Sequence, residues 1–439
     1  MRQHALRIFN AAVEAVDPEK AVLRHLKKRE NALWIDEQRL DLADYDRILV
    51  VGAGKADAPM ARAVEKVLGE DITGGSIVVK DGHGLPLNRI TVHEAGHPVP
   101  DGRGVQGAEA ILDTVRDAGE RDLVICLLSG GGSALLVSPV EGVDLEDKQG
   151  VTRLLLSCGA TIHEINAVRK HLSRVKGGRL AGLAHPATVV SLVLSDVVGD
   201  DLDVIASGPT VPDRSTFGQA VDVLKGYKVW AQVPDAAKRH LKMGLAGDIE
   251  DTPKPGDPAF EKDCLALVGT NLQALKAAGE EAKALGYPSL ILSSMIQGEA
   301  REVAKAFSAV PKEIIRSGLP VSAPACILCG GETTVTIKGA GKGGRNQEFA
   351  LAAAFDIDGI DGVVALSGGS DGTDGPTDAA GAVADGATLT RARKLGLDPK
   401  AHLEENNAYP FFKELGDLII TGPTRTNVMD IYMMLVGKP

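Results

Sequence analysis

The stretch Leu123-Val124-Ile125-Cys126-Leu127-Leu128-Ser129-Gly130-Gly131-Gly132-Ser133 decides the fold class, because an unbroken apolar run passes directly into glycines and serines. Apolar runs without polar alternation are typical of strands buried on both faces of a parallel sheet. Similar runs occupy residues 47–51, 76–79, 188–194, 264–268, 289–292, 325–328, 362–366 and 418–420. Segments with helical periodicity, such as residues 56–68 and 272–285, lie between them. This alternation predicts an α/β protein.

A stretch rich in glycine and proline, residues 242–262, interrupts the alternation. It has no apolar period and carries acidic residues among Gly244, Gly247, Pro253, Pro255, Gly256 and Pro258. This composition is typical of a linker or of an excursion between domains. We therefore expect an N-terminal domain over residues 1–240, a linker or excursion over 241–262, and a C-terminal α/β domain over 263–439.

The charge and composition exclude several classes of protein. The 439 residues include 48 Lys and Arg against 59 Asp and Glu, which gives a net charge of −11. An acidic chain is poorly suited to displacing the counterions of a nucleic acid, and 3 % aromatic residues offer few platforms for base stacking. No apolar run reaches the roughly 18–20 residues of a membrane span, and the five cysteines are scattered. We expect a cytoplasmic protein that binds neither nucleic acid nor membranes, and a homo-oligomer stays open.

Glycines and polar residues follow nearly every apolar run. Because the carboxyl ends of parallel strands share one edge of a sheet, where ligands bind, these loops are candidate site residues. The strongest candidate for an anion-binding loop consists of Ser129, Gly130, Gly131, Gly132 and Ser133. Its glycines allow backbone N–H groups to converge on one point, and a following helix adds its positive end. The alternative is a tight turn.

Two cations follow glycines at predicted helix starts. Lys55 follows Gly52-Ala53-Gly54 at the N-terminal end of a predicted helix, where the helix dipole disfavours a cation. We therefore expect Lys55 to face a ligand. A solvated lysine at the start of a helix is the alternative. Arg345 follows Gly343-Gly344 before an alanine-rich helix. Its planar guanidinium suits a phosphate, and we expect Gly344 to belong to the same anion-binding site.

One dense basic segment, residues 166–179, stands out in the acidic chain. At helical spacing one face carries Asn166, Arg169, Lys170 and Ser173. This face is interpreted as a positive wall that attracts an anionic substrate. An ordinary solvated helix face is the alternative.

A glycine-rich loop that follows residues 362–366 carries Asp371 and Asp374. Carboxylate ligands in such a loop suit Mg²⁺ that is held jointly with nucleotide phosphates. A polar turn rich in aspartate is the alternative.

Seven blocks in this order resemble the class II glycerate 2-kinases, whose C-terminal region is called the MOFRL domain. The blocks are VGAGKA (51–56), EAGHPVPD (94–101), LSGGGSA (128–134), NAVRKH (166–171), LSDVVGD (194–200), ASGPT (206–210) and GGRNQE (343–348). The resemblance implies a Rossmann-like N-terminal parallel sheet with helices on both faces, a smaller C-terminal α/β domain and an active site in the cleft between them. It also implies that ATP phosphorylates D-glycerate at its 2-hydroxyl, with a divalent cation, giving 2-phosphoglycerate and ADP.

The resemblance also implies roles for single residues. The catalytic Lys and Arg proposed for that family match Lys55 and Arg345, which would stabilise the migrating phosphoryl group. On this scheme Arg169 and loop 129–133 bind the glycerate carboxylate. Asp196, which ends a buried strand, orients the substrate hydroxyl or the metal, with Glu332 as the alternative. The metal candidates are therefore Asp196, Glu332, Asp371 and Asp374.

Two other functions stay open. An NAD(P)H-dependent hydroxypyruvate reductase is suggested by Gly52-x-Gly54 after a strand, although Asp57 stands where the dinucleotide fingerprint needs its third glycine. A non-catalytic sensor of anionic metabolites would need the loops but no carboxylate loop for a metal.

Overall fold

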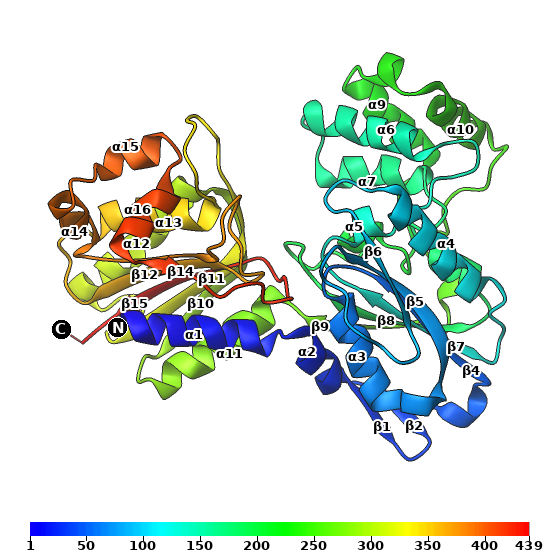
Figure 1. Cartoon of the computed structure of the whole chain (residues 1–439), viewed down its shortest axis with the longest axis horizontal. Coiled ribbons are helices and arrows are strands. Elements are labelled where there is room, and N and C mark those ends of the chain that lie inside the picture. Colours follow the sequence, from blue (N-terminus) through cyan, green and yellow to red (C-terminus); the bar gives the residue numbers. More distant parts are fainter. Residues whose placement is uncertain (439) are drawn as a thin grey trace. The chain divides into compact units, whose positions relative to one another are not determined.

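The computed structural model in Figure 1 describes residues 1–438 and divides into two compact units. The N-terminal unit contains Pro18–Ser195 and Asp200–Val268, and the C-terminal unit contains Met1–Asp17, Asp196–Gly199 and Gly269–Pro439. Each unit has its own six-stranded sheet with helices packed against it. The predicted α/β class is confirmed.

The sheet of the N-terminal unit is parallel and follows the order β6-β5-β4-β7-β8-β9. Its strands are β4 (Arg47–Ala53), β5 (Ile72–Lys80), β6 (Thr91–Ala95), β7 (Asp122–Leu128), β8 (Thr188–Leu194) and β9 (Cys264–Gly269). Every residue of β7 and β8 is buried, as expected for apolar runs with no solvent-facing side. The loops after β4, β6, β7 and β8 therefore emerge at one edge of the sheet.

Helices cover both faces of this sheet. The crossovers through α3 (Asp57–Leu68) and α4 (Gly102–Arg116) run in opposite directions along the strand order, so right-handed connections place them on opposite faces. A separate helical cluster packs around shared apolar residues. It consists of α6 (Leu145–Ser157), α7 (Ile162–His171), α9 (Phe217–Gly226) and α10 (Asp235–Ala246).

Short elements complete this unit. They are α2 (Pro18–His25), α5 (Gly132–Leu135), α8 (Arg179–Ala184) and an antiparallel sheet of β1 (Leu26–Arg29), β2 (Ala32–Ile35) and β3 (Gln38–Asp41). No helix within residues 1–438 is long and apolar enough to cross a membrane.

The sheet of the C-terminal unit is mixed and follows the order β10-β11-β15-β12-β13-β14. The strands are β10 (Ser289–Glu299), β11 (Ala325–Thr334), β12 (Val363–Gly369), β13 (Gly381–Asp385), β14 (Leu418–Ile419) and β15 (Asp430–Val436). β15 runs antiparallel to both β11 and β12. The first residue of β15 therefore lies beside the carboxyl ends of two neighbouring strands.

Helices pack on both faces of this second sheet as well (Figure 1). On one face lie α1 (Arg2–Ala15) and α11 (Asn271–Ala284), and on the other α12 (Ala300–Ser317), α13 (Arg345–Asp356) and α16 (Ala408–Leu415). The remaining helices are α14 (Thr388–Lys394) and α15 (Pro399–Glu404).

The unit boundaries differ from the expected domains at three places, one of which is Asp196–Gly199, a stretch of the expected N-terminal domain that belongs to the C-terminal unit. Helix α1 belongs to the C-terminal unit, where its Phe9 is fully buried and Arg2 pairs with Asp385 and Asp417. The stretch expected as a linker or an excursion lies inside the N-terminal unit, where the backbone N–H of Asp213 donates to Pro253 O at 2.9 Å. Proline and glycine here shape a packed loop, and the chain enters the C-terminal unit at Gly269 instead.

Candidate active site

The glycine-rich loop after β7 is tied to the start of α3. Ser129 is buried; its hydroxyl donates to Asp57 Oδ1 and accepts from the backbone N–H of Ala56 at 3.0 Å. The backbone N–H of Lys55 donates to Gly130 O at 2.9 Å. Burial raises the pKa of Asp57 well above its ordinary value. Asp57 stands where a dinucleotide-binding fingerprint would have its third glycine, and here it anchors the loop that follows β7.

Two glycines allow a close approach that brings Lys55 and His97 to this loop. A Cβ on Gly54 would lie 2.0 Å from Ser129 Oγ. Gly131 has φ +87°, and a Cβ there would lie 3.0 Å from His97 Cδ2 and 3.2 Å from Lys55 Cγ. The loops after β4, β6 and β7 therefore meet at one point, as their shared sheet edge predicts.

The Lys55 ammonium has no hydrogen-bonded or ion-paired partner among residues 1–438. The Lys55 carbonyl is held by His83 Nδ1 at 2.8 Å. Burial, followed by the charge of Lys55 and its basic neighbours, lowers the pKa of His97 to about 4. At neutral pH His97 is therefore uncharged, and the cation at this edge is Lys55.

A cavity of about 410 Å³ opens beside the loop; we call it the cationic cavity. Gly131, Ser133 and His97 contribute to its wall. Its basic lining residues are Lys148, Arg153, Arg169 and Lys176. No carboxylate of the described chain lines it. Such a cavity attracts anions by its local field.

Arg169, which the sequence predicts to bind the substrate, lines the cationic cavity. Its guanidinium has no ion pair with any described residue, and burial lowers its pKa. Asn166, one helical turn earlier on α7, is 2 % exposed and accepts from the Ser207 hydroxyl at 3.1 Å. The Ser207 hydroxyl also lies 3.0 Å from that of Ser133. Asn166 Nδ2 is buried without a partner in residues 1–438, so both N–H groups of its side-chain amide are available as donors.

Lys170 differs from its expected role. Its buried ammonium pairs with Asp203 and, at 3.2 Å, with Asp213, and the residue does not line the cationic cavity. Neighbouring residues on a helix point in different directions, so Lys170 cannot share the orientation of Arg169. The charge of Lys170 is therefore neutralised by two aspartates of the protein, in an ion-pair cluster with a structural role.

The helix after the loop is short, as the early Pro139 indicates. α5 contains four residues, and the dipole of so short a helix gives its N-terminal end little positive potential. The positive potential of this edge therefore comes from side chains. Lys148 and Lys176 supply two of them. Lys176 lies in the basic segment 166–179, whereas nothing in the sequence marks Lys148 as a site residue. Lys148 lies in a polar helical segment that resembles an exposed face.

In the C-terminal unit, Arg345 begins α13 and is held by two carboxylates. Its Nε and Nη2 donate to Asp430 at 2.6 and 3.0 Å, and its Nη1 lies 3.0 Å from Glu332. Burial works against the charged form, but the charges of Asp430 and Glu332 outweigh it and raise the pKa of Arg345. Asp430, the buried first residue of β15, was not expected from the sequence. It fixes the orientation of the guanidinium.

The expected anion site at the start of α13 already contains an anion. The backbone N–H groups of Asn346 and Gln347 donate to Asp374 at 3.1 and 2.9 Å. A Cβ on Gly344 would lie 2.3 Å from Asp374 Cγ. Gly344 therefore makes room for this carboxylate rather than for phosphate, and Asp374 is occupied as a helix cap instead of being available to a metal.

The other metal candidates remain predictions. Asp371 accepts from the N–H of Thr373 in a turn, Glu332 pairs with Arg345, and Asp196 follows Ser195 after β8. No group of three or more His, Cys, Asp or Glu side chains able to hold a metal ion is present in the described chain. Since Mg²⁺ commonly takes one or two protein carboxylates together with phosphate oxygens, Glu332 and Asp371 fit it better than Asp374.

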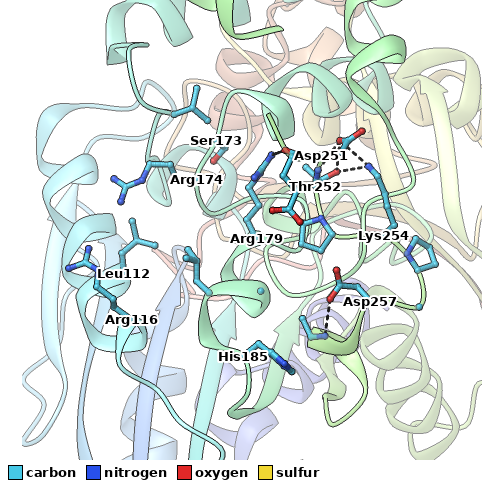
Figure 2. A pocket seen from close by; sticks show the side chains of 18 residues that line it. Leu112, Arg116, Ser173, Arg174, Arg179, His185, Asp251, Thr252, Lys254 and Asp257 are labelled. Carbon is cyan, nitrogen blue, oxygen red and sulfur yellow. Dashed lines mark hydrogen bonds and ion pairs between the residues drawn. The ribbon is translucent and has the colours of Figure 1, made fainter. Parts of the chain in front are cut away.

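A larger cavity of about 820 Å³ lies in the N-terminal unit, beside α4, α8 and residues 250–257 (Figure 2). Its charges are largely paired: Lys254 lies 3.1 Å from Asp251, and Arg174 pairs with Glu109. Its described lining includes none of the predicted site residues. This cavity is therefore the weaker candidate for the active site.

Two family models match the chain. The "Domain of unknown function (DUF4147)" matches residues 4–242, and the "MOFRL family" matches residues 325–430.

Proteins of similar length match nearly the whole chain. A glycerate 2-kinase of Pyrococcus horikoshii is 42 % identical over 99 % of this chain and 97 % of the relative. A putative hydroxypyruvate reductase of Agrobacterium vitis is 44 % identical over 99 % and 94 %. The crystal structure of a glycerate kinase from Thermotoga maritima superimposes with a TM-score of 0.89 and 42 % identity, covering 99 % of both chains.

Proposed function

Because the chain belongs to the class II glycerate 2-kinase family, we propose that it transfers the γ-phosphoryl group of ATP to the 2-hydroxyl of D-glycerate. The products are 2-phosphoglycerate and ADP. The observation that carries this proposal is the cationic cavity beside the loop of residues 129–133, since both substrates are anions and the cavity has no carboxylate among its described lining residues.

Phosphoryl transfer requires positioning and charge stabilisation more than covalent chemistry. We assign the migrating phosphoryl group to Lys55, whose ammonium has no partner among residues 1–438. Arg169, Ser133 and Asn166 bind the acid substrate. Asn166 and Ser133 are held in place through the Ser207 hydroxyl, and groups held in this way need little reorganisation when charge moves in the transition state.

Arg345 supplies a second cation. Two hydrogen bonds to the buried Asp430 fix the orientation of the Arg345 guanidinium. Its Nη1 pairs with Glu332, and we propose that a phosphate oxygen replaces Glu332 there. We assign Asp196 to orienting the substrate hydroxyl.

Mg²⁺ is the metal that we propose, held by Glu332 and Asp371. When bound with ATP, it neutralises charge on the phosphate oxygens. Asp374 has no part in this assignment, because both its oxygens accept backbone hydrogen bonds at the start of α13.

We place the protein in the cytoplasm. All five cysteines are free thiols, which fits a reducing compartment.

The test is ATP consumption coupled to ADP detection, with and without D-glycerate, and with the product position assigned by phosphorus NMR. We expect glycerate-dependent ADP and a phosphate on the 2-oxygen. Loss of nicotinamide absorbance with hydroxypyruvate, without any glycerate-dependent ADP, would instead support a reductase. Binding of glycerate without either reaction would support a metabolite sensor.

A further inference from the structure

Two buried lysines of the cationic cavity lack counter-ions. Lys148 is 6 % exposed and donates to Leu172 O at 3.1 Å, and Lys176 is 1 % exposed and donates to Ala206 O at 3.2 Å. Neither ammonium pairs with a carboxylate of the described chain. A buried ammonium without a counter-ion is strongly disfavoured, so these two lysines lower the stability of the folded protein when no ligand is bound.

Lys170 shows how the same unit neutralises a lysine that has a structural role. Like Lys176 it is 1 % exposed, but its ammonium pairs with Asp203 and Asp213. Lys148 and Lys176 instead line a cavity that a ligand can enter. The missing counter-ion is therefore expected to come from the ligand.

The surrounding charges are all basic. The titratable and charged groups that share the cavity with the two lysines are His97, Arg153 and Arg169. Burial, together with the charge of Arg169, lowers the pKa of Lys148 to about 7. Burial and the charges of Lys148, Arg169 and Lys170 lower the pKa of Lys176 well below its ordinary value. Without a ligand, the cavity therefore holds fewer protons than its residue types indicate.

The kind of anion follows from what the cavity lacks. The phosphates of ATP are accompanied by Mg²⁺, which needs oxygen ligands from the protein. The described lining offers no carboxylate for that ion. An anion that binds without a metal, such as a carboxylate, fits the cavity better.

We propose that Lys148 and Lys176 are the counter-charges of the substrate carboxylate, so that the cavity selects small hydroxy-acid anions and takes up a proton from the solvent when one binds. This inference rests on the proposed glycerate kinase function. Both are substrate-binding residues that act together with Arg169.

The first experiment measures binding of D-glycerate without ATP, by calorimetry, to the full chain and to Lys148→Gln and Lys176→Gln. Glutamine keeps a donor for the Leu172 or Ala206 carbonyl and removes the charge. We expect Kd to rise at least tenfold in each variant, with KM for ATP changed less than twofold. The matched control is Lys262→Gln, which removes an exposed lysine paired with Glu120 and should leave both constants unchanged.

Two results would overturn the inference. Folded variants that bind D-glycerate as tightly as the unmodified chain would show that the lysines do not meet the carboxylate. A rise in KM for ATP with an unchanged Kd for D-glycerate would assign the cavity to nucleotide phosphates.

The second experiment needs no variant and so remains decisive if a substitution prevents folding. The Kd of D-glycerate is measured from pH 6 to 9 in buffers of different ionisation enthalpy. We expect proton uptake on binding and a Kd that rises above pH 7, approaching tenfold per pH unit for one coupled proton. A Kd that is independent of pH, with no proton exchanged, would refute the inference.

The outcome is distinguishable from failure of the proposed function. If the unmodified chain binds D-glycerate with proton uptake but forms no ADP, the kinase proposal fails while the lysine site stands. If ADP forms from D-glycerate but the lysine variants bind normally, the kinase proposal stands and the lysine site fails.

Discussion

Lys55 carries a positive charge at the N-terminal end of a helix, where the helix dipole makes a cation unfavourable. It stands immediately before α3, and its ammonium has no partner among residues 1–438. The close approach of Gly131 sets its stem against the anion loop. Helix stability does not explain a lysine here, which is the reason that the proposed function assigns its charge to the phosphoryl group.

We predict that Lys55→Met lowers kcat/KM for D-glycerate by roughly 10²–10³, the usual cost of losing one group that stabilises transition-state charge. Steady-state kinetics with circular dichroism as a check of folding measures this. Lys66→Met is the matched control, because Lys66 lies in the last turn of the same helix and pairs with Glu19. Equal activity of the two variants would remove Lys55 from the mechanism.

At the residue scale, the sequence indicates functional groups best where glycines accompany them. Lys55, Ser133 and Arg169 were expected at a site, and the structure places all three at the carboxyl edge of one sheet or in the cationic cavity. Lys148 could not be found in this way, because its helical neighbours are polar and its burial comes from tertiary packing. The neutralisation of Lys170 likewise depends on aspartates 33 and 43 residues away.

At the scale of elements, the start of α13 shows a carboxylate of the protein in a place that suits a ligand. Asp374 accepts from two backbone N–H groups, and burial raises its pKa to about 6, opposed by those hydrogen bonds. The ordinary pKa of an aspartate is 3.8. The folded chain therefore keeps the proton of Asp374 to higher pH than the unfolded chain does.

This difference predicts how stability depends on pH. Below pH 4 Asp374 is protonated in both states, and between pH 4 and 6 the unfolded state loses the proton first. The contribution of this group to the free energy of unfolding should therefore be lost as pH rises through that window. We expect the stability of the unmodified chain relative to Asp374→Asn to fall from pH 4 to 6 and to level off above it.

Urea denaturation of both proteins at several pH values checks this expectation. The control is Asp398→Asn, which changes an aspartate that caps α15 at an exposed position. A relative stability that rises from pH 4 to 6 would mean that Asp374 is charged in the folded state throughout the window.

The sequence pattern predicts the parallel strands better than the antiparallel ones. β7 and β8 are continuous apolar runs that end in polar loops, so their position and direction follow from the pattern. β15 was not among the expected strands, although it lies between β11 and β12. Residues 431–436 form an apolar run that indicates a strand. Its partners, however, begin 105 and 67 residues earlier, and pairing over such a separation has no local signal in the sequence.

At the scale of the whole molecule, the order of the chain is not the order of its units. The first 17 residues belong to the C-terminal unit, so that unit needs both ends of the chain. Phe9 explains why: it is fully buried, and a Cβ on Gly368 of β12 would lie 2.7 Å from its ring. An amphipathic pattern in a sequence shows that the apolar face of the helix must be buried, but it does not show against which sheet.

We predict that Phe9→Ala destabilises the C-terminal unit by about 3–5 kcal/mol, the usual cost of deleting a buried aromatic ring. Hydrogen exchange on the full chain should show faster exchange in α11 and β12, with β4 and β7 of the N-terminal unit unchanged. Phe355→Ala is the matched control, since Phe355 is 38 % exposed on α13 and should cost much less. If exchange instead increased in β4 and β7, α1 would belong to the sheet that follows it in sequence. On the role proposed for Arg345, which lies in the C-terminal unit with Asp430, local opening of this unit would also lower activity.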